Sequence, residues 1–245
     1  MARQESKAVK QLCLAREVTN GVVLLKRGLG EVQASGYTAN EYHPALLLLA
    51  SGSERLMKAV LCLFDLSSKG AYPSCEDMKR WGHDLKELLE LIRQKCKDSD
   101  YAGRCAACKR DVELLDDKVL LGFLRILADF GQYGRYHNFD VVGSNSKVGQ
   151  YPESQWLTHQ LTVILDENEK NAWFTDLPEE DDDSLLAKIR RRTVILIEGF
   201  ARALARLFMF GPLGQEGRQM HAFIADFLNL TDDELGTRDY QRSRS

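Results

Sequence analysis

The chain has 245 residues, 44% of them hydrophobic and 28% charged, which is enough to bury a substantial core without disulfides or a structural metal. Its formal net charge of −3 argues against a generally basic nucleic-acid-binding protein and confines any such contact to a local patch. The N-terminus lacks the apolar core of a signal peptide, and no apolar run approaches the length of a membrane span. We therefore expect a cytoplasmic protein without membrane contact.

Helical periodicity dominates the chain and only five prolines interrupt it, so we predict an all-α fold. Apolar spacing predicts the first two helices at about 5–34 and 44–67, the second with Pro44 in its first turn. Glu54 and Lys58 stand four residues apart on the second helix, in the order that favours an exposed ion pair worth about 0.3–0.5 kcal/mol.

The start of the third helix has two interpretations. Ser74 can begin a helix that continues through the following apolar positions. Alternatively, Gly82 separates a short turn from a helix that begins near His83, where Asp84 and Glu87 form its capping pair. Either interpretation places His83 and Asp84 near a helix start, where the local sequence favours a capping or solvent-facing histidine.

A polar stretch between Cys96 and Cys108 predicts a loop that carries a Cys-x-x-Cys pair, Cys105 and Cys108. Two thiolates at this spacing can share a tetrahedral zinc, with Cys96 as a third ligand. A structural site needs four ligands, and Cys75 or His83 would have to complete it. Since the six cysteines are otherwise scattered, we expect reduced thiols and neither a metal nor a cofactor.

The second half of the chain is also predicted to be helical. An acidic run at 179–183 is interpreted as a solvated loop. Arginines on the helix that follows could form a basic face for RNA, but internal or solvated pairing is the favoured interpretation. These arginines are Arg190, Arg191, Arg192, Arg202 and Arg206. The helices are expected at about 110–130, 153–171, 184–210 and 216–228.

The stretch 131–140 combines Arg135, His137, Asn138 and three aromatic residues directly after an apolar helix. Arginine holds phosphate in a fork and histidine moves protons near neutral pH, so this cluster could bind or cleave a phosphodiester. It could equally be a helix cap and a rigid turn. The chain lacks a nucleotide phosphate-binding loop, a dinucleotide fingerprint, a nucleophile elbow and a zinc-protease helix, which disfavours those enzyme classes.

Three short motifs occur in an order that resembles the HEPN superfamily of helical-bundle proteins, in particular its poorly characterised bacterial members. They are Gly-x-Glu-Arg-Leu-Met-Lys-Ala from Gly52, Gly-His-Asp-Leu from Gly82, and Arg-Tyr-His-Asn from Arg135. The resemblance covers roughly residues 5–140. It implies an up-and-down bundle of four or five helices, often dimeric. Many relatives are metal-independent ribonucleases in toxin–antitoxin, phage-defence or CRISPR-associated systems.

The active motif of those relatives is an arginine followed, after four to six residues, by a histidine, and this sequence departs from it. One residue separates Arg135 from His137, and two separate Arg80 from His83 and Arg218 from His221. A general base for the ribose 2′-hydroxyl must therefore come from elsewhere in the fold.

We hypothesise a cleft that engages RNA or nucleotide phosphate. In the catalytic version, Arg135 stabilises the phosphorane, His137 or His83 transfers a proton, and Glu54 with Lys58 orients the arginine. In the competing hypothesis the chain is a non-catalytic interaction module, and Arg135 pairs inside the bundle with Glu54 or Asp84. A third class is a cysteine-ligated metal protein. The predicted cleft residues are Glu54, Lys58, His83, Asp84, Arg135, His137 and Asn138.

The domain prediction follows from the extent of the resemblance. We expect an HEPN-like bundle at 1–150, a C-terminal helical extension at 151–236 packed on it, and a disordered, arginine-rich tail at 237–245. The expected partners are RNA, a second protein and a second copy of the chain.

Overall fold

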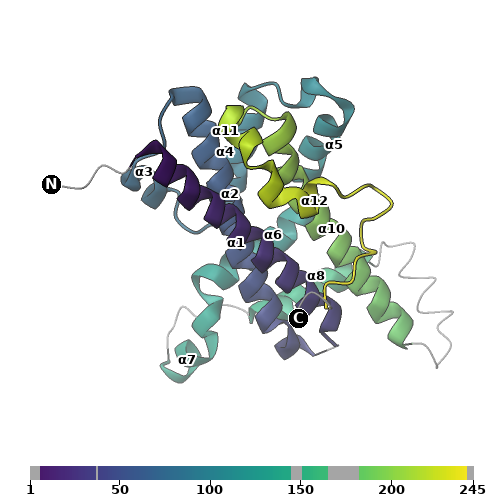
Figure 1. The fold of residues 1–245 in the computed structure, drawn as a ribbon. Helices are drawn as coiled ribbons and strands as arrows, with labels where there is room; N and C mark the ends of the chain where they lie inside the picture. The colour runs from purple at the N-terminus through teal and green to yellow at the C-terminus, as the bar shows by residue number, and fades with distance from the viewer. Residues whose placement is uncertain (1–5, 37, 145–150, 165–181, 242–245) are drawn as a thin grey trace.

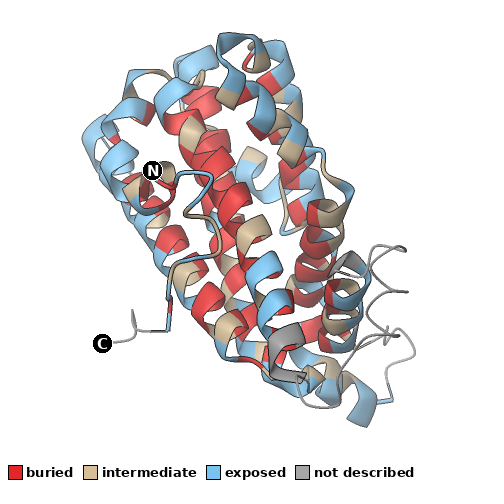
Figure 2. Ribbon diagram, turned by 90° about the vertical axis from the view of Figure 1, so that its right-hand side faces the viewer, coloured by how far each residue is buried: buried red, intermediate tan, exposed pale blue. Residues whose placement is uncertain are grey.

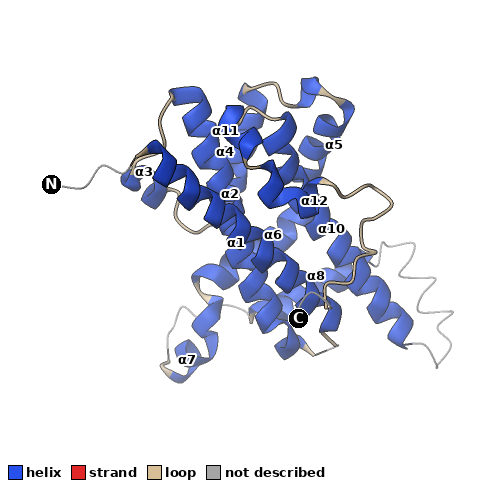
Figure 3. Ribbon diagram, in the orientation of Figure 1, coloured by secondary structure: helices blue, strands red, loops and turns tan. Residues whose placement is uncertain are grey.

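The computed structural model describes residues 6–36, 38–144, 151–164 and 182–241 (Figure 1). All regular secondary structure in these ranges is helical, which confirms the all-α prediction (Figure 3). In chain order the helices are α1 (Lys7–Ala34), η1 (Ala39–Tyr42), α2 (His43–Lys69), α3 (Cys75–Arg80), α4 (Leu85–Asp98), η2 (Ala102–Arg104), α5 (Ala106–Leu115), α6 (Lys118–Gln132), η3 (Gly134–Tyr136), α7 (His137–Val142), α8 (Pro152–Ile164), α10 (Asp182–Phe210), α11 (Gly214–Gln219), η4 (His221–Ile224) and α12 (Ala225–Leu228).

Helices α1 and α2 form a closely packed antiparallel pair that crosses the molecule (Figure 1). Gly21 meets Gly52, and Gly28, later in α1, meets Leu49, earlier in α2, which sets the antiparallel direction. A Cβ atom on Gly52 would lie 2.9 Å from the backbone nitrogen of Leu25 and 3.0 Å from the carbonyl oxygen of Gly21. Glycine is therefore needed where the two backbones approach each other.

One continuous hydrophobic core joins the two halves of the chain. Helix α10 packs against α1, α2, α5, α6 and α8. The buried residues line the inner faces of the central helices (Figure 2). The core therefore contains side chains from both predicted units, 1–150 and 151–236. Fully buried examples are Leu25 in α1, Leu49 in α2, Phe123 in α6, Trp156 in α8 and Phe200 in α10.

The prediction of a single helix at 110–130 is wrong, because the structure divides this segment between two helices, α5 and α6. Helix α5 ends at Leu115, and Asp117 then caps α6. The Asp117 carboxylate accepts hydrogen bonds from the backbone N–H groups of Val119 and Leu120, both at 2.9 Å. An aspartate in this position satisfies donors that a new helix leaves free, and so favours a restart over a continuous helix.

The third helical region follows the second of the two interpretations. Ser74 and Asp77 form a capping box for the short helix α3. Gly82, with φ of 60°, then turns the chain. Asp84 caps α4 by accepting a hydrogen bond from the backbone N–H of Lys86 at 2.8 Å. His83 therefore lies immediately before Asp84, the N-cap residue of α4.

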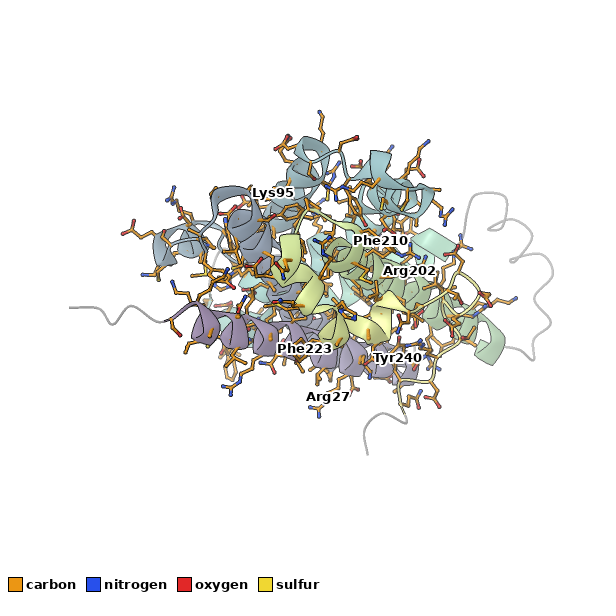
Figure 4. The ribbon with its side chains drawn as sticks, turned by 45° about the horizontal axis from the view of Figure 1, so that its top comes forward. Arg27, Lys95, Arg202, Phe210, Phe223 and Tyr240 are labelled. Carbon is orange, nitrogen blue, oxygen red and sulfur yellow. The ribbon has the colours of Figure 1, made fainter. Side chains whose placement is uncertain are left out.

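The C-terminal segment is more ordered than the sequence suggested. The helix expected at 216–228 is divided into α11, η4 and α12. Beyond it lies Tyr240 (labelled in Figure 4), which is buried. Its backbone N–H donates to Gln33 at 2.8 Å, and its hydroxyl donates to Glu198 at 2.7 Å. This placement corrects the expectation of a disordered tail as far as residue 241, and 242–245 lie outside the described residues.

Two other predicted segments extend beyond the residues that the structure describes. The helix expected at 153–171 is described only as α8, and 165–171 lie outside the described residues. The same holds for 179–181 of the acidic run, while α10 already begins at Asp182. Within the described ranges, none of the helices has the length and apolarity needed to cross a membrane.

Candidate functional site

A cleft of about 420 Å³ lies between α1, α2 and the segment that leads from α3 to α4, with η3 also contributing. We call it the Glu54 cleft. Apolar side chains such as Leu14 and Met78 form part of its wall. Its polar lining consists of Glu17, Ser51, Glu54, Arg55, Lys58, His83 and Arg135.

Glu54 is the central residue of this cleft. Its Oε1 atom accepts a hydrogen bond from Lys58 Nζ at 2.9 Å and lies 2.8 Å from His83 Nδ1. Lys58 lies one helical turn after Glu54, so both side chains leave the same face of α2. The Glu54 carboxyl side chain is 19% exposed and the His83 side chain is 71% exposed. The carboxylate thus holds the imidazole through Nδ1, while Nε2 is the ring nitrogen left for a bound molecule.

Arg135 reaches the cleft from η3, directly after α6 ends. It is exposed, and it forms no ion pair with the residues that the structure describes. Glu54 is engaged by Lys58 and His83, and Asp84 caps α4. The pairing of Arg135 with Glu54 or Asp84 that the competing hypothesis requires is therefore not found in this part of the chain.

The other residues of the predicted cluster lie against Tyr151. The ring of His137 meets the Tyr151 ring edge-on, with centroids 5.1 Å apart. The side chain of Asn138 lies close enough to Tyr151 to affect the pKa of its hydroxyl. Neither residue lines the Glu54 cleft. The structure thus divides the predicted site. Glu54, Lys58, His83 and Arg135 line one cleft. Asp84 directly follows His83 in the sequence, and His137 and Asn138 lie outside the cleft.

Sequence reasoning missed the opposite wall of the cleft. Arg55 pairs there with Glu17 of α1. Ser51, one residue before the Gly52 motif, also lines the cleft. Arg55 was visible within that motif, but Glu17 carries no local signal, because only the packing of α1 against α2 brings it to Arg55. The cleft therefore holds two carboxylates and three cationic side chains besides His83.

The segment from η3 to α7 exposes several apolar side chains. Helix α7 projects from the body of the molecule (Figure 1). Its contacts with the rest of the chain are few, and none of its residues is buried. Because these side chains contribute little to the core, their substitution is expected to cost little stability. They are Tyr133, Tyr136, Phe139, Val141 and Val142.

The cysteines do not assemble the zinc site that the sequence analysis considered. Cys105 is exposed, Cys108 and Cys96 are buried, and the sulfur atoms of Cys105 and Cys108 lie 2.8 Å apart. Among the described residues, no three histidine, cysteine, aspartate or glutamate side chains are grouped so that they could hold a metal ion.

Comparison of the chain with protein-family models, with curated proteins and with solved structures finds no match. The HEPN resemblance therefore stays a prediction, and the geometry of the cleft is the remaining basis for a proposed function.

Proposed function

We propose that the protein is a metal-independent endoribonuclease whose active site is the Glu54 cleft. The observation that carries this proposal is the contact between Glu54 and His83 beside Lys58 and Arg135. A carboxylate that binds one imidazole nitrogen fixes the tautomer and leaves the other nitrogen as a base, as in other carboxylate–histidine pairs. Cationic side chains beside that base suit a phosphodiester.

In the proposed reaction, His83 Nε2 removes the proton of a ribose 2′-hydroxyl, and the 2′-oxygen attacks the adjacent phosphorus. The bond from phosphorus to the 5′-oxygen breaks, and that oxygen takes a proton from solvent. The products are a 2′,3′-cyclic phosphate and a 5′-hydroxyl end. Arg135 and Lys58 stabilise the negative charge that develops on the phosphorane oxygens.

This assignment revises the choice between the two histidines. The sequence left His137 and His83 as alternatives, and only His83 lines the cleft with Arg135. The HEPN resemblance supports the reaction class. It also leads us to propose a cytoplasmic homodimer that acts with a protein partner in a toxin–antitoxin or phage-defence system. Sedimentation equilibrium would measure the oligomeric state.

The alternative function is binding without catalysis. The exposed side chains of Tyr136, Phe139 and Val142 favour it, because exposed aromatic and apolar groups commonly mark contact surfaces. In this version the chain is an interaction module, and the Glu54 cleft holds RNA or a phosphate group without cleaving it.

The test is an RNA-cleavage assay in the presence of a chelator, with wild type, His83→Ala and Arg135→Ala. Each substitution is expected to lower the cleavage rate by about 100-fold or more while the protein stays folded. His137→Ala is the matched control and is expected to keep the activity, since His137 lies against Tyr151.

Two results would contradict the ribonuclease. One is a folded wild type that binds RNA in a fluorescence anisotropy titration but leaves it intact, which would support the binding module. The other is cleavage that survives in His83→Ala, which would show a contaminating nuclease or another base.

A further inference from the structure

A second cluster of reactive groups lies at the start of α5, in a segment that contributes nothing to the Glu54 cleft. Cys105 is the N-cap of this helix, and its sulfur accepts a hydrogen bond from the backbone N–H of Cys108 at 3.2 Å. The two sulfur atoms lie 2.8 Å apart. A cysteine in place of the usual serine or aspartate cap therefore puts two thiols in direct contact.

The two thiols have opposite environments. Cys105 is exposed and Cys108 is buried. Hydrogen bonds from the Cys108 thiol and from the Cys108 backbone N–H lower the pKa of Cys105, although Asp111 nearby opposes this. Burial, followed by the hydrogen bond with Cys105, raises the pKa of Cys108 to about 11. The exposed Cys105 sulfur is thus the better nucleophile and would attack first. The buried Cys108 sulfur would react second.

Cys108 lies beside a buried polar network. The Tyr101 side chain and the Asp111 carboxylate both affect the pKa of its thiol. The Tyr101 hydroxyl donates to Asp111 at 3.1 Å, and Arg206 of α10 donates to the other oxygen of Asp111 at 2.9 Å. The network anchors α5 to α10 next to the buried sulfur, and because that sulfur already lies 2.8 Å from the exposed one, no large movement is needed for the two to react.

We propose that Cys105 and Cys108 form a redox-active dithiol that exchanges with small-molecule disulfides. The proposal is independent of the ribonuclease function. Residues three apart at a helix start have Cβ atoms about 5–6 Å apart, within the range that a modest adjustment converts to disulfide geometry. In a reducing compartment the pair would remain a dithiol until such an oxidant appears.

The exchange proceeds in two balanced steps. The Cys105 thiolate attacks one sulfur of a disulfide RS–SR, forms a mixed disulfide with one RS group, and releases the other RS as a thiolate. Cys108 then gives up its proton to the medium, and its sulfur attacks the Cys105 sulfur and expels the second RS as a thiolate. Overall, two protein thiols lose two electrons to form one disulfide, and RS–SR is reduced to two RSH.

The experiment uses the full chain and oxidised glutathione as the disulfide. Peptide mapping after rapid alkylation would locate each modified cysteine. Cys105→Ser and Cys108→Ser are the test variants, and serine at 105 preserves a good helix cap. Cys108→Ala replaces Cys108→Ser if the buried hydroxyl prevents folding. Exposed Cys13 and Cys75 are the matched internal controls.

Wild type is expected to form an intramolecular Cys105–Cys108 disulfide that reduced glutathione reverses. Cys108→Ser should accumulate a glutathione adduct on Cys105, and Cys105→Ser should form neither product. Cys105 should react about tenfold faster than Cys13 or Cys75 at neutral pH, because more of it is thiolate. Wild type that forms no Cys105–Cys108 disulfide, or a Cys105 that reacts no faster than the controls, would overturn the proposal. So would thiols that react only after a chelator removes bound zinc.

Discussion

Two carboxylate clusters of similar chemistry occupy different environments. In the Glu54 cleft, a carboxylate contacts a lysine and a histidine, and the histidine side chain is 71% exposed. On α5, the Asp111 carboxylate contacts a tyrosine and an arginine, and its side chain is only 3% exposed. Exposed ion pairs contribute about 0–1 kcal/mol, whereas breaking a buried pair costs about 3–5 kcal/mol. The comparison leads us to expect that substitutions in the cleft cost little stability, whereas substitutions in the network on α5 cost much more.

Burial also affects the ionisation of the second cluster. It raises the pKa of Asp111 even though the Arg206 guanidinium opposes this effect. The charge on Asp111 is thus tolerated mainly because Arg206 and Tyr101 bind its oxygen atoms. Loss of Arg206 would leave the buried carboxylate without its bonded cationic partner.

The largest expected effect therefore comes from Arg206→Ala. We expect it to lower the free energy of unfolding by about 3–5 kcal/mol, because Asp111 loses its cationic partner in the core. Urea denaturation followed by circular dichroism measures this change. Arg135→Ala is the matched control and should change stability by less than about 0.5 kcal/mol. A similar, small change in both variants would remove the distinction between the two clusters.

The backbone beneath the cleft should be more sensitive than its side chains. Gly52→Ala places a Cβ atom against the backbone of Leu25 and Gly21, so we expect a loss of about 1–3 kcal/mol as α1 and α2 are pushed apart. In the control Gly131→Ala, the added Cβ meets nothing within 4 Å, and a stabilisation of about 0.5–1 kcal/mol is expected in the helix. Equal stabilities of the two variants would contradict a close backbone contact between α1 and α2 at Gly52.

A pH titration of stability tests whether buried and paired carboxylates behave differently. Burial raises the pKa of Glu198 above its ordinary value of 4.5. The folded chain then holds this proton more tightly than the unfolded chain, so its contribution to stability is complete below pH 4.5 and is lost as the pH rises through the folded pKa. Glu198→Gln should therefore gain stability relative to wild type as the pH rises from 4 to 7, in denaturation curves recorded at each pH.

Asp65 provides the control of opposite sign. Burial opposes its ionisation, but hydrogen bonds from Lys69 and Lys95 outweigh burial and lower its pKa from 3.8. Its contribution to stability is present above pH 3.8 and is lost as the pH falls through the lowered folded pKa. Asp65→Asn should therefore approach wild-type stability only in strong acid. Equal slopes for the Glu198 and Asp65 variants would contradict both assignments.

Apart from the controls, the variant expected to change stability least is Glu54→Gln. The amide keeps the shape of the side chain, and the partly exposed pairs with Lys58 and His83 contribute about 0.5–1 kcal/mol. RNA cleavage should nevertheless fall by about 10- to 100-fold, since His83 loses the carboxylate that fixes its tautomer. A variant that is much less stable but still active would assign Glu54 to the structure rather than to the site.

Most of the predicted residues that line one cleft in the structure belong to local motifs. Glu54 and Lys58 share one turn of α2, and His83 lies before a recognisable helix cap. Helical periodicity places such residues well. Their meeting with Arg135 followed from the order of the motifs in the HEPN resemblance, not from any single motif.

The break between α5 and α6 was missed for a local reason: apolar spacing continues through Asp117, so periodicity alone could not show that one helix ends and the next begins there.

The other features that sequence reasoning missed depend on contacts between separate segments of the chain. Glu17 reaches Arg55 only through the packing of α1 on α2. Tyr240 is a single aromatic residue in a polar segment, and nothing nearby shows that Gln33 and Glu198 bind it. His137 and Asn138 follow Arg135 directly, yet the chain turns them toward Tyr151.

The contact between Gln33 and Tyr240 also has a consequence for synthesis on the ribosome. It joins residues 207 positions apart, and both the amide and the carbonyl group of the Gln33 side chain take part in binding the C-terminal segment. During translation, the first helix is made long before this partner leaves the exit tunnel. Until then, part of α1 stays uncovered. We therefore expect nascent chains that stop before residue 240 to bind chaperones, and the segment around Tyr240 to cover α1 only once it has left the exit tunnel.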